Sequence, residues 1–183
     1  MYTLLLVDDE EDVIEVIERK VSWEQIGFHV VGHAGNGFKA LEMMEDMQPD
    51  VVMTDIRMPY MDGLELCSNI RQRFPATKLL LFTGFDDFEY AKEAVHLEIE
   101  EYILKPLNLA EITEVFKKLK TKLDDELNEK KNTDILKQYY AASLPVLQSN
   151  FYTTLIEGRI PENELGRYMR DYKIVLEGPY YCC

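Results

Sequence analysis

The stretch Val51-Val52-Met53-Thr54-Asp55 decides the fold of this chain. Four residues of strand character run directly into a carboxylate, and a loop with Pro59 and Gly63 follows. A short apolar run bounded by polar and turn residues is typical of a strand that is covered on both faces of a parallel sheet. In open α/β sheets, ligands bind at the edge where the strands end in loops. We therefore expect Asp55 to lie at a reactive edge.

Further apolar runs of strand length lie on both sides of this one, and patterns of helical period separate them. The expected strands are residues 3–7, 28–34, 51–54, 78–82 and 102–104. Each expected helix has apolar residues at helical spacing on its inward face: Ile14 and Ile17 in the first, Leu41 and Met44 in the second, Leu66 and Ile70 in the third, Ala91, Ala94 and Val95 in the fourth, and Ile112 and Phe116 in the fifth. Asp86 or Asp87 is expected to cap the fourth helix. This alternation with short connections predicts an α/β fold, a doubly wound five-stranded parallel sheet. Right-handed crossovers then place all strand ends at one edge.

Polar residues follow four of the expected strands, namely Asp8 and Asp9, Asp55, Thr83 and Lys105. Carboxylates that crowd one rim repel each other, and their pKa values rise unless a cation lies among them. Mg²⁺ favours carboxylate oxygens and water and can bridge to a phosphoryl oxygen. Lys105 and Thr83 would supply an ammonium and a hydroxyl for the remaining phosphoryl oxygens. The pattern predicts a phosphoryl-accepting site in which Asp55 attacks phosphorus.

Composition narrows the classes of partner. The net charge of −14 argues against direct contact with nucleic acid or an anionic membrane, because both are densely negative. We identify neither a signal peptide nor a membrane span. The cysteines are Cys67, Cys182 and Cys183, which form no disulfide framework. A reducing cytoplasm is the expected location.

Ordered motifs in this chain resemble the receiver domain of bacterial two-component response regulators. The motifs are Val7-Asp8-Asp9-Glu10, Thr54-Asp55-Ile56-Arg57-Met58-Pro59, Met61-Asp62-Gly63, Thr83-Gly84 and Tyr102-Ile103-Leu104-Lys105-Pro106. The resemblance covers residues 1–122 and implies the flavodoxin-like, CheY-like receiver fold with strand order 2-1-3-4-5. The protein it implies is a phosphoprotein of signal transduction that assists its own aspartyl phosphorylation and dephosphorylation and is not otherwise an enzyme.

The resemblance also implies roles for single residues. Asp55 is the phosphoacceptor, which takes the phosphoryl group from a sensor histidine kinase. Thr83 and Lys105 bind that group, and Thr83 and Tyr102 form the switch. The implied Mg²⁺ ligands are Asp8, Asp9, Asp55 and the backbone carbonyl of Arg57.

Three further sequence segments indicate a subfamily. Ser22-Trp23-Glu24, Asp55-Ile56-Arg57-Met58-Pro59 and the segment from Gly84 to Ala91 look like regulators whose output is an AraC-type DNA-binding domain. That output domain is not in this chain, so DNA contact and transcription regulation would come only through it.

Two residues depart from the receiver pattern, because Tyr60 and Glu98 stand where glycine is usual. A left-handed backbone at Glu98 would cost about 1 kcal/mol relative to glycine. We therefore expect the end of the fourth helix to adjust instead, which would alter the surface that responds to phosphorylation.

The last third of the chain is predicted as a helical linker over 123–150 and the start of a truncated further domain over 151–183. The fifth helix is expected to run beyond the sheet, restart at Asn132-Thr133-Asp134 and kink or restart at Pro145. Gly158 is a plausible helix end and Pro161 opens a short helix. A strand is expected over Lys173 to Leu176.

Other classes of protein fit less well. A phosphatase with an aspartyl nucleophile would want a second acid where Arg57 stands, and a flavodoxin-like cofactor binder would want a hydroxyl- and glycine-rich loop in place of the acidic run after the first strand. A receiver that acts only as a scaffold or through dimerisation, without phosphorylation, remains the alternative. A homodimer through the last third of the chain is left open.

Overall fold

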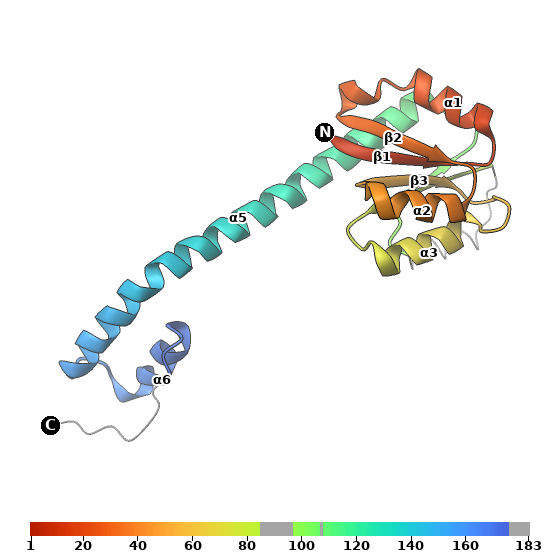
Figure 1. Ribbon diagram of the computed structural model, residues 1–183. Coiled ribbons are helices and arrows are strands. Elements are labelled where there is room, and N and C mark those ends of the chain that lie inside the picture. Colours follow the sequence, from red (N-terminus) through yellow and green to blue (C-terminus); the bar gives the residue numbers. More distant parts are fainter. Residues whose placement is uncertain (85–96, 107, 176–183) are drawn as a thin grey trace. The chain divides into compact units, whose positions relative to one another are not determined.

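The computed structural model describes residues 1–84, 97–106 and 108–175, and of Thr83 it describes the backbone (Figure 1). The elements are β1 (Tyr2–Val7), α1 (Glu11–Lys20), the 3-10 helix η1 (Trp23–Ile26), β2 (Phe28–Ala34), α2 (Gly37–Met47), β3 (Val51–Asp55), α3 (Gly63–Arg73), β4 (Lys78–Thr83), β5 (Glu101–Leu104), α5 (Leu109–Ile156) and α6 (Glu162–Asp171). The helix expected after Asp86 or Asp87 lies outside the described residues. The chain divides into two compact units, Met1–Asp124 and Asp125–Cys183.

The first unit contains the predicted sheet. Its five strands are parallel in the order β2-β1-β3-β4-β5, which confirms the expected fold class and strand order. The register pairs Asp55 with Phe82 and Thr83 with Leu104, so the ends of β3, β4 and β5 lie at one level. The carboxyl ends of these neighbouring strands therefore form one edge.

Successive residues of each strand point to opposite faces, and both faces are covered. Leu4, Leu6 and Met53 belong to the core shared with α1 and α5. Leu5 and Val52 belong to the core shared with α2 and α3. Figure 1 shows α2 and α3 together on one side of the sheet and α1 on the other. The uninterrupted apolar runs in the sequence arise because each strand contributes to both cores.

Aromatic rings hold α5 against the sheet. The Phe116 ring meets Trp23 edge-on at a centroid distance of 4.7 Å and Phe28 at 5.0 Å. Phe116 and Phe28 are fully buried, and Trp23 donates its indole N–H to the carbonyl of Ile17 at 3.2 Å. Such edge-to-face pairs add to the stabilisation that burial itself gives. The N-terminal turns of α5 are thus part of the core of the first unit.

Helix α5 runs without interruption from Leu109 to Ile156, which corrects the predicted restarts. It does not restart at Asn132-Thr133-Asp134, because no glycine or proline before Pro145 breaks its hydrogen bonds. It also continues through Pro145 and so does not restart there, although a proline inside a helix removes a backbone donor and crowds the preceding turn. The predicted extension of this helix beyond the sheet is correct.

In the second unit, the end of α5 packs on α6. Phe151 is buried and contacts the rings of Tyr168 and Tyr172 at centroid distances of 6.4 and 6.3 Å. Gln148 donates its side-chain N–H to the Tyr172 carbonyl at 2.9 Å. The segment expected as a strand from Lys173 is not one over its described residues 173–175, because Lys173 has a left-handed backbone with φ 52°. Gly158, with φ 68°, and the helix after Pro161 agree with prediction.

Glu98 has a left-handed backbone with φ 53°, so the expectation that the chain would adjust there is wrong. The guanidinium of Arg71 explains this conformation, because it donates to the carbonyls of Leu97 at 3.1 Å and Glu98 at 2.9 Å, and also to that of Pro75 at 3.2 Å. These bonds offset the cost of the left-handed turn. The altered switch surface that we inferred at Glu98 loses its basis.

The turn from β3 into α3 depends on Gly63. Its N–H donates to the Ile56 carbonyl at 2.8 Å, and a Cβ at this position would lie 2.0 Å from the Asp55 carbonyl oxygen. We predict that Gly63→Ala destabilises the first unit by on the order of 3 kcal/mol, because backbone rather than a flexible side chain must move. Chemical denaturation followed by the fluorescence of Trp23, the only tryptophan, measures this change.

Gly166→Ala is the matched control. Gly166 lies inside α6, where a Cβ would meet only the end of the Arg170 side chain at 3.6 Å. The Trp23 transition should not shift in this variant. An equal shift in both variants, or none in Gly63→Ala, would contradict the steric role of Gly63.

Candidate functional site

The carboxyl edge of the sheet brings together side chains that are far apart in sequence. Asp8 follows β1 and is buried, and its backbone N–H donates to the Ala34 carbonyl at 3.1 Å. Asp55 ends β3 and is also buried, with its Oδ1 accepting the N–H of Ile56 at 2.7 Å. Lys105 follows β5. The strand ends therefore place two buried carboxylates beside one ammonium.

Lys105 holds this cluster together. Its Nζ donates to Oδ2 of Asp8 at 3.1 Å, to Oδ2 of Asp55 at 3.2 Å and to Oε1 of Glu10 at 3.3 Å. The same ammonium lies 5.1 Å from the centroid of the Phe82 ring, which is a cation–π distance. The ammonium therefore touches the potential nucleophile and its acidic neighbours at once.

Electrostatics at this edge are unbalanced. Burial raises the pKa of Asp8, although the backbone N–H of Glu10 and the nearby Lys105 oppose the shift. Burial lowers the pKa of Lys105, but the charges of Asp55 and Asp8 outweigh that effect and raise it overall. Lys105 is thus firmly protonated, whereas Asp8 is a carboxylate that a second cation would stabilise.

The predicted acid cluster has the geometry of a small-cation site. Asp8, Asp9 and Asp55 each offer one carboxylate oxygen, and these oxygens lie within 4.8 Å of one another. Asp9 is exposed and the other two are buried, so the cluster is open to solvent on one side. Oxygen ligands with room for water suit Mg²⁺, and the donor set fits this ion.

The remaining predicted residues lie at or near the same edge. Thr83 is the last residue of β4, and its side chain is outside the described part of the structure. Tyr102 lies in β5, opposite Leu81, and is half-buried against the core beneath α2 and α3. Arg57 is exposed in the loop after Asp55. Thr83 therefore lies at the end of β4, Arg57 lies just beyond the end of β3, and Tyr102 lies two residues before the end of β5.

Glu10 contributes to this site, although its sequence position alone did not indicate a role. It appeared only as the third acid of the first motif, and no role was assigned to it. The structure pairs its carboxylate with Lys105. The available signal was its place directly after two strand-end acids, which is compatible with an ordinary residue at the start of a helix.

Tyr60, the second departure from the receiver pattern, also has a left-handed backbone, with φ 72°. The N–H of Met61 donates to the Pro59 carbonyl at 2.9 Å, so Tyr60 is the central residue of a three-residue turn. Its side chain is 87% exposed. The loop after Asp55 therefore carries a large aromatic side chain in solvent.

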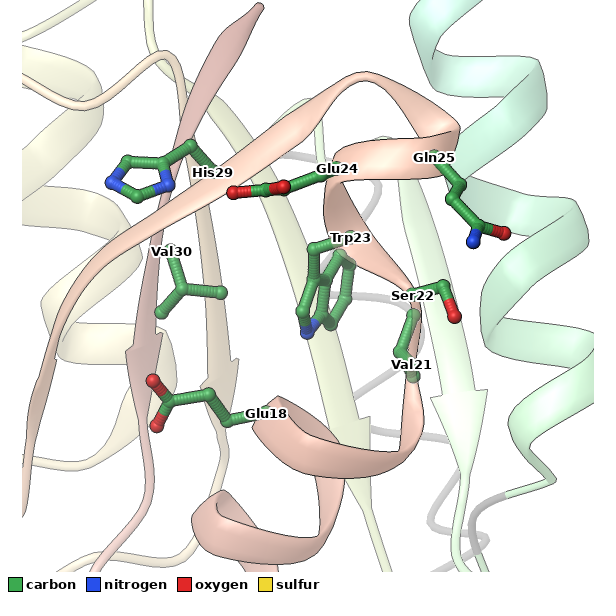
Figure 2. Close-up of a pocket in the computed structure, with 8 residues that line it drawn as sticks. All are labelled: Glu18, Val21, Ser22, Trp23, Glu24, Gln25, His29 and Val30. Atoms are coloured by element: carbon green, nitrogen blue, oxygen red, sulfur yellow. The ribbon is translucent and has the colours of Figure 1, made fainter.

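Hollows on the described part of the first unit include one of about 730 Å³ along α1, lined by Glu11, Asp12, Ile14, Glu15, Glu18, Arg19 and His33, and two further ones. One, of about 360 Å³, is at the far end of α1 and contains none of the predicted site residues. Figure 2 shows its lining, which is Glu18, Val21, Ser22, Trp23, Glu24, Gln25, His29 and Val30. The other, of about 380 Å³, adjoins the site and is lined by Asp12, Val13, Val16, Lys105 and Pro106. This hollow is lined in part by Lys105, whose ammonium contacts Asp55.

Among the described residues, no helix is long and apolar enough to cross a membrane.

Known proteins resemble this chain over the same region. The chain is 37% identical over 137 residues to an uncharacterized transcriptional regulatory protein, YesN, of Bacillus subtilis. The aligned residues cover 75% of this chain and 37% of that protein. It is 26% identical over 164 residues to the transcriptional regulatory protein HptR of Staphylococcus aureus, which covers 89% of this chain and 64% of that one. The chain thus spans less than two thirds of the length of these curated relatives.

Solved structures show the same likeness. The REC domain of AraT, a response regulator from Geobacillus stearothermophilus, has a TM-score of 0.65 and 36% identity over 69% of this chain and 98% of that one. A two-component transcriptional regulator AraC from Clostridium phytofermentans has a TM-score of 0.63 and 31% identity, with the same coverage. The family described as the response regulator receiver domain matches residues 4–117. Because this match agrees with the strand order and the acidic edge of the sheet, the chain belongs to the response regulator receiver domain family.

Proposed function

We propose that this chain takes a phosphoryl group from the phosphohistidine of a sensor histidine kinase onto Asp55 and thereby switches a transcriptional output domain. The observation that carries the proposal is the contact of the Lys105 ammonium with the carboxylates of both Asp55 and Asp8. A phosphoryl-accepting aspartate needs such a fixed cation beside it, because negative charge accumulates during transfer.

The chemistry assigns one task to each residue. A carboxylate oxygen of Asp55 attacks phosphorus, so that a P–O bond forms as the P–N bond of the donor histidine breaks. Lys105, and in our proposal the Thr83 hydroxyl, donate hydrogen bonds to the transferred oxygens. Asp8, Asp9, Asp55 and the backbone carbonyl of Arg57 are the proposed holders of Mg²⁺. When bound, Mg²⁺ neutralises charge on the phosphoryl oxygens.

The hollow beside Lys105 is the surface that we assign to the kinase. Its lining is largely apolar, with Val13 and Val16 from α1 and Pro106 from the loop after β5. Val16 is 51% exposed. An exposed apolar patch next to a reactive group is typical of a protein-binding surface. A helix of the kinase placed there would bring its phosphohistidine to Asp55.

The switch and the output are the remaining parts of the proposal. Phosphorylation adds about −1.5 to −2 charge and strong acceptor oxygens at Asp55, which can draw Thr83 toward the site and make room for Tyr102 to rotate. The output we propose is an AraC-type DNA-binding domain, supported by the greater length of the curated relatives and the name of the Clostridium protein. Only that domain would touch DNA. A cytoplasmic location is consistent with the free, buried Cys67.

Asp55→Asn should abolish the covalent phosphate that acetyl phosphate and Mg²⁺ introduce, because an amide is not a nucleophile for phosphorus. Intact-mass spectrometry with peptide mapping measures the adduct. The fold should persist, since the amide oxygen can still accept the N–H of Ile56. An unlabelled wild-type protein would favour the phosphorylation-independent scaffold, and labelling of the variant at residue 55 would contradict the assignment of Asp55.

Mg²⁺ should stabilise the wild-type protein by about 1.4 kcal/mol at ten times its Kd. Asp8→Asn should remove this effect, because it deletes one proposed ligand. Without Mg²⁺ the same variant should unfold roughly 2–4 °C above wild type, a gain of about 1 kcal/mol, because fewer carboxylates then share one ammonium. Thermal unfolding in Mg²⁺ and in EDTA measures both effects, and a lower unfolding temperature of Asp8→Asn in EDTA would contradict the charge crowding.

We also propose that residues 1–122 form the receiver, 123–150 a helical linker and 151–183 the start of a further domain. The compact first unit supports this division, and Tyr2 ties its end to the sheet by a 2.7 Å hydrogen bond to Asp124. A fragment of residues 1–124 should therefore fold and be labelled by acetyl phosphate at the rate of the whole chain. Loss of its cooperative Trp23 fluorescence transition would show that the second unit is needed for folding.

A further inference from the structure

The Lys105 ammonium has no donor to spare. It carries three N–H groups, and three carboxylates accept from it, those of Asp8, Asp55 and Glu10. The ring of Phe82 lies beside the same ammonium. A phosphoryl group that needs a hydrogen bond from Lys105 must therefore displace one of these carboxylates.

Glu10 is the partner that can leave at least cost. Its side chain is 64% exposed, whereas those of Asp8 and Asp55 are 0% and 8% exposed. Water can solvate the released Glu10 carboxylate, but the Oδ2 atom of either aspartate would lose its bond to Lys105 in a buried position. The carboxylates of Asp8 and Asp55 are also proposed ligands of Mg²⁺, so a second cation would balance their charge.

The backbone of Glu10 is fixed while its side chain is not. Its N–H donates to Oδ1 of Asp8 at 2.9 Å, and its carbonyl accepts the N–H of Val13 at 3.0 Å. It occupies the N-cap position of α1, yet its side chain makes no capping hydrogen bond. The carboxylate instead extends to Lys105, so its position serves the ion pair rather than the helix.

We propose that Glu10 is a positioning residue that holds the Lys105 ammonium in the unphosphorylated protein and competes with the phosphoryl group for it. This inference rests on the proposed function. Glu10 thereby sets how readily Asp55 is phosphorylated, because each transfer must first release its ion pair. The strength of an exposed ion pair corresponds to an effect of about two- to fivefold.

Glu10→Gln tests this role, because it removes the charge and keeps the shape. At saturating Mg²⁺, the variant should be labelled by acetyl phosphate about two- to fivefold faster than wild type. It should also bind fluoroberyllate, a phosphoryl analogue, with a Kd lower by a similar factor in calorimetry. Slower labelling or weaker fluoroberyllate binding would overturn the inference.

Glu11→Gln is the matched control. Glu11 is the next residue, is exposed and carries the same charge, and within the described residues it makes no ion pair with Lys105. Both variants remove one negative charge at the start of α1, so the difference between them reports the contact of Glu10 with Lys105. Equal rates in Glu10→Gln and Glu11→Gln would overturn the role of Glu10.

A double-mutant cycle with Lys105→Met separates competition from a merely structural effect. In that background, the advantage of Glu10→Gln over Glu11→Gln should disappear, because the ammonium is absent. An advantage that persists would mean that Glu10 acts by another route. An unlabelled wild-type protein would overturn the proposed function together with this inference, whereas failure of the comparison in a labelled protein overturns the inference by itself.

Discussion

The interaction on which the site depends is the Lys105 ammonium among the carboxylates at the end of the sheet. Two of these carboxylates, Asp8 and Asp55, are buried, and a buried carboxylate needs a cation or hydrogen-bond donors beside it. One lysine balances only part of that charge, which is why burial still raises the pKa of Asp8. The edge therefore keeps an excess of negative charge, which the proposed Mg²⁺ would balance.

The rest of the first unit keeps that edge in place. Strands covered on both faces cannot shift their register without exposing apolar side chains, so the pairing of Asp55 with Phe82 is held by the two cores. Gly63 lets α3 begin directly against the Asp55 carbonyl, and Phe116 ties α5 to β2. Stability of the core and precision of the site thus have the same origin.

Helix α5 links this arrangement to the remainder of the chain. Its first turns are buried against the sheet, and the hydrogen bond from Tyr2 to Asp124 fastens it where the first unit ends. It then continues as one helix to Ile156, where Phe151 packs on α6.

The sequence by itself determined the α/β fold and the meeting of Asp8, Asp55 and Lys105, because apolar period identifies the strands and right-handed crossovers place their ends at one edge. The strand order came from the resemblance of its motifs to receiver domains. Only the tertiary structure decided which carboxylates share the Lys105 protons, since Glu10 and Lys105 are 95 positions apart. The same holds for Glu98, whose left-handed backbone depends on the distant Arg71, and for the continuity of α5 through Pro145. Local sequence preference predicts each helix and strand, but features such as these depend on contacts between segments that are distant in sequence.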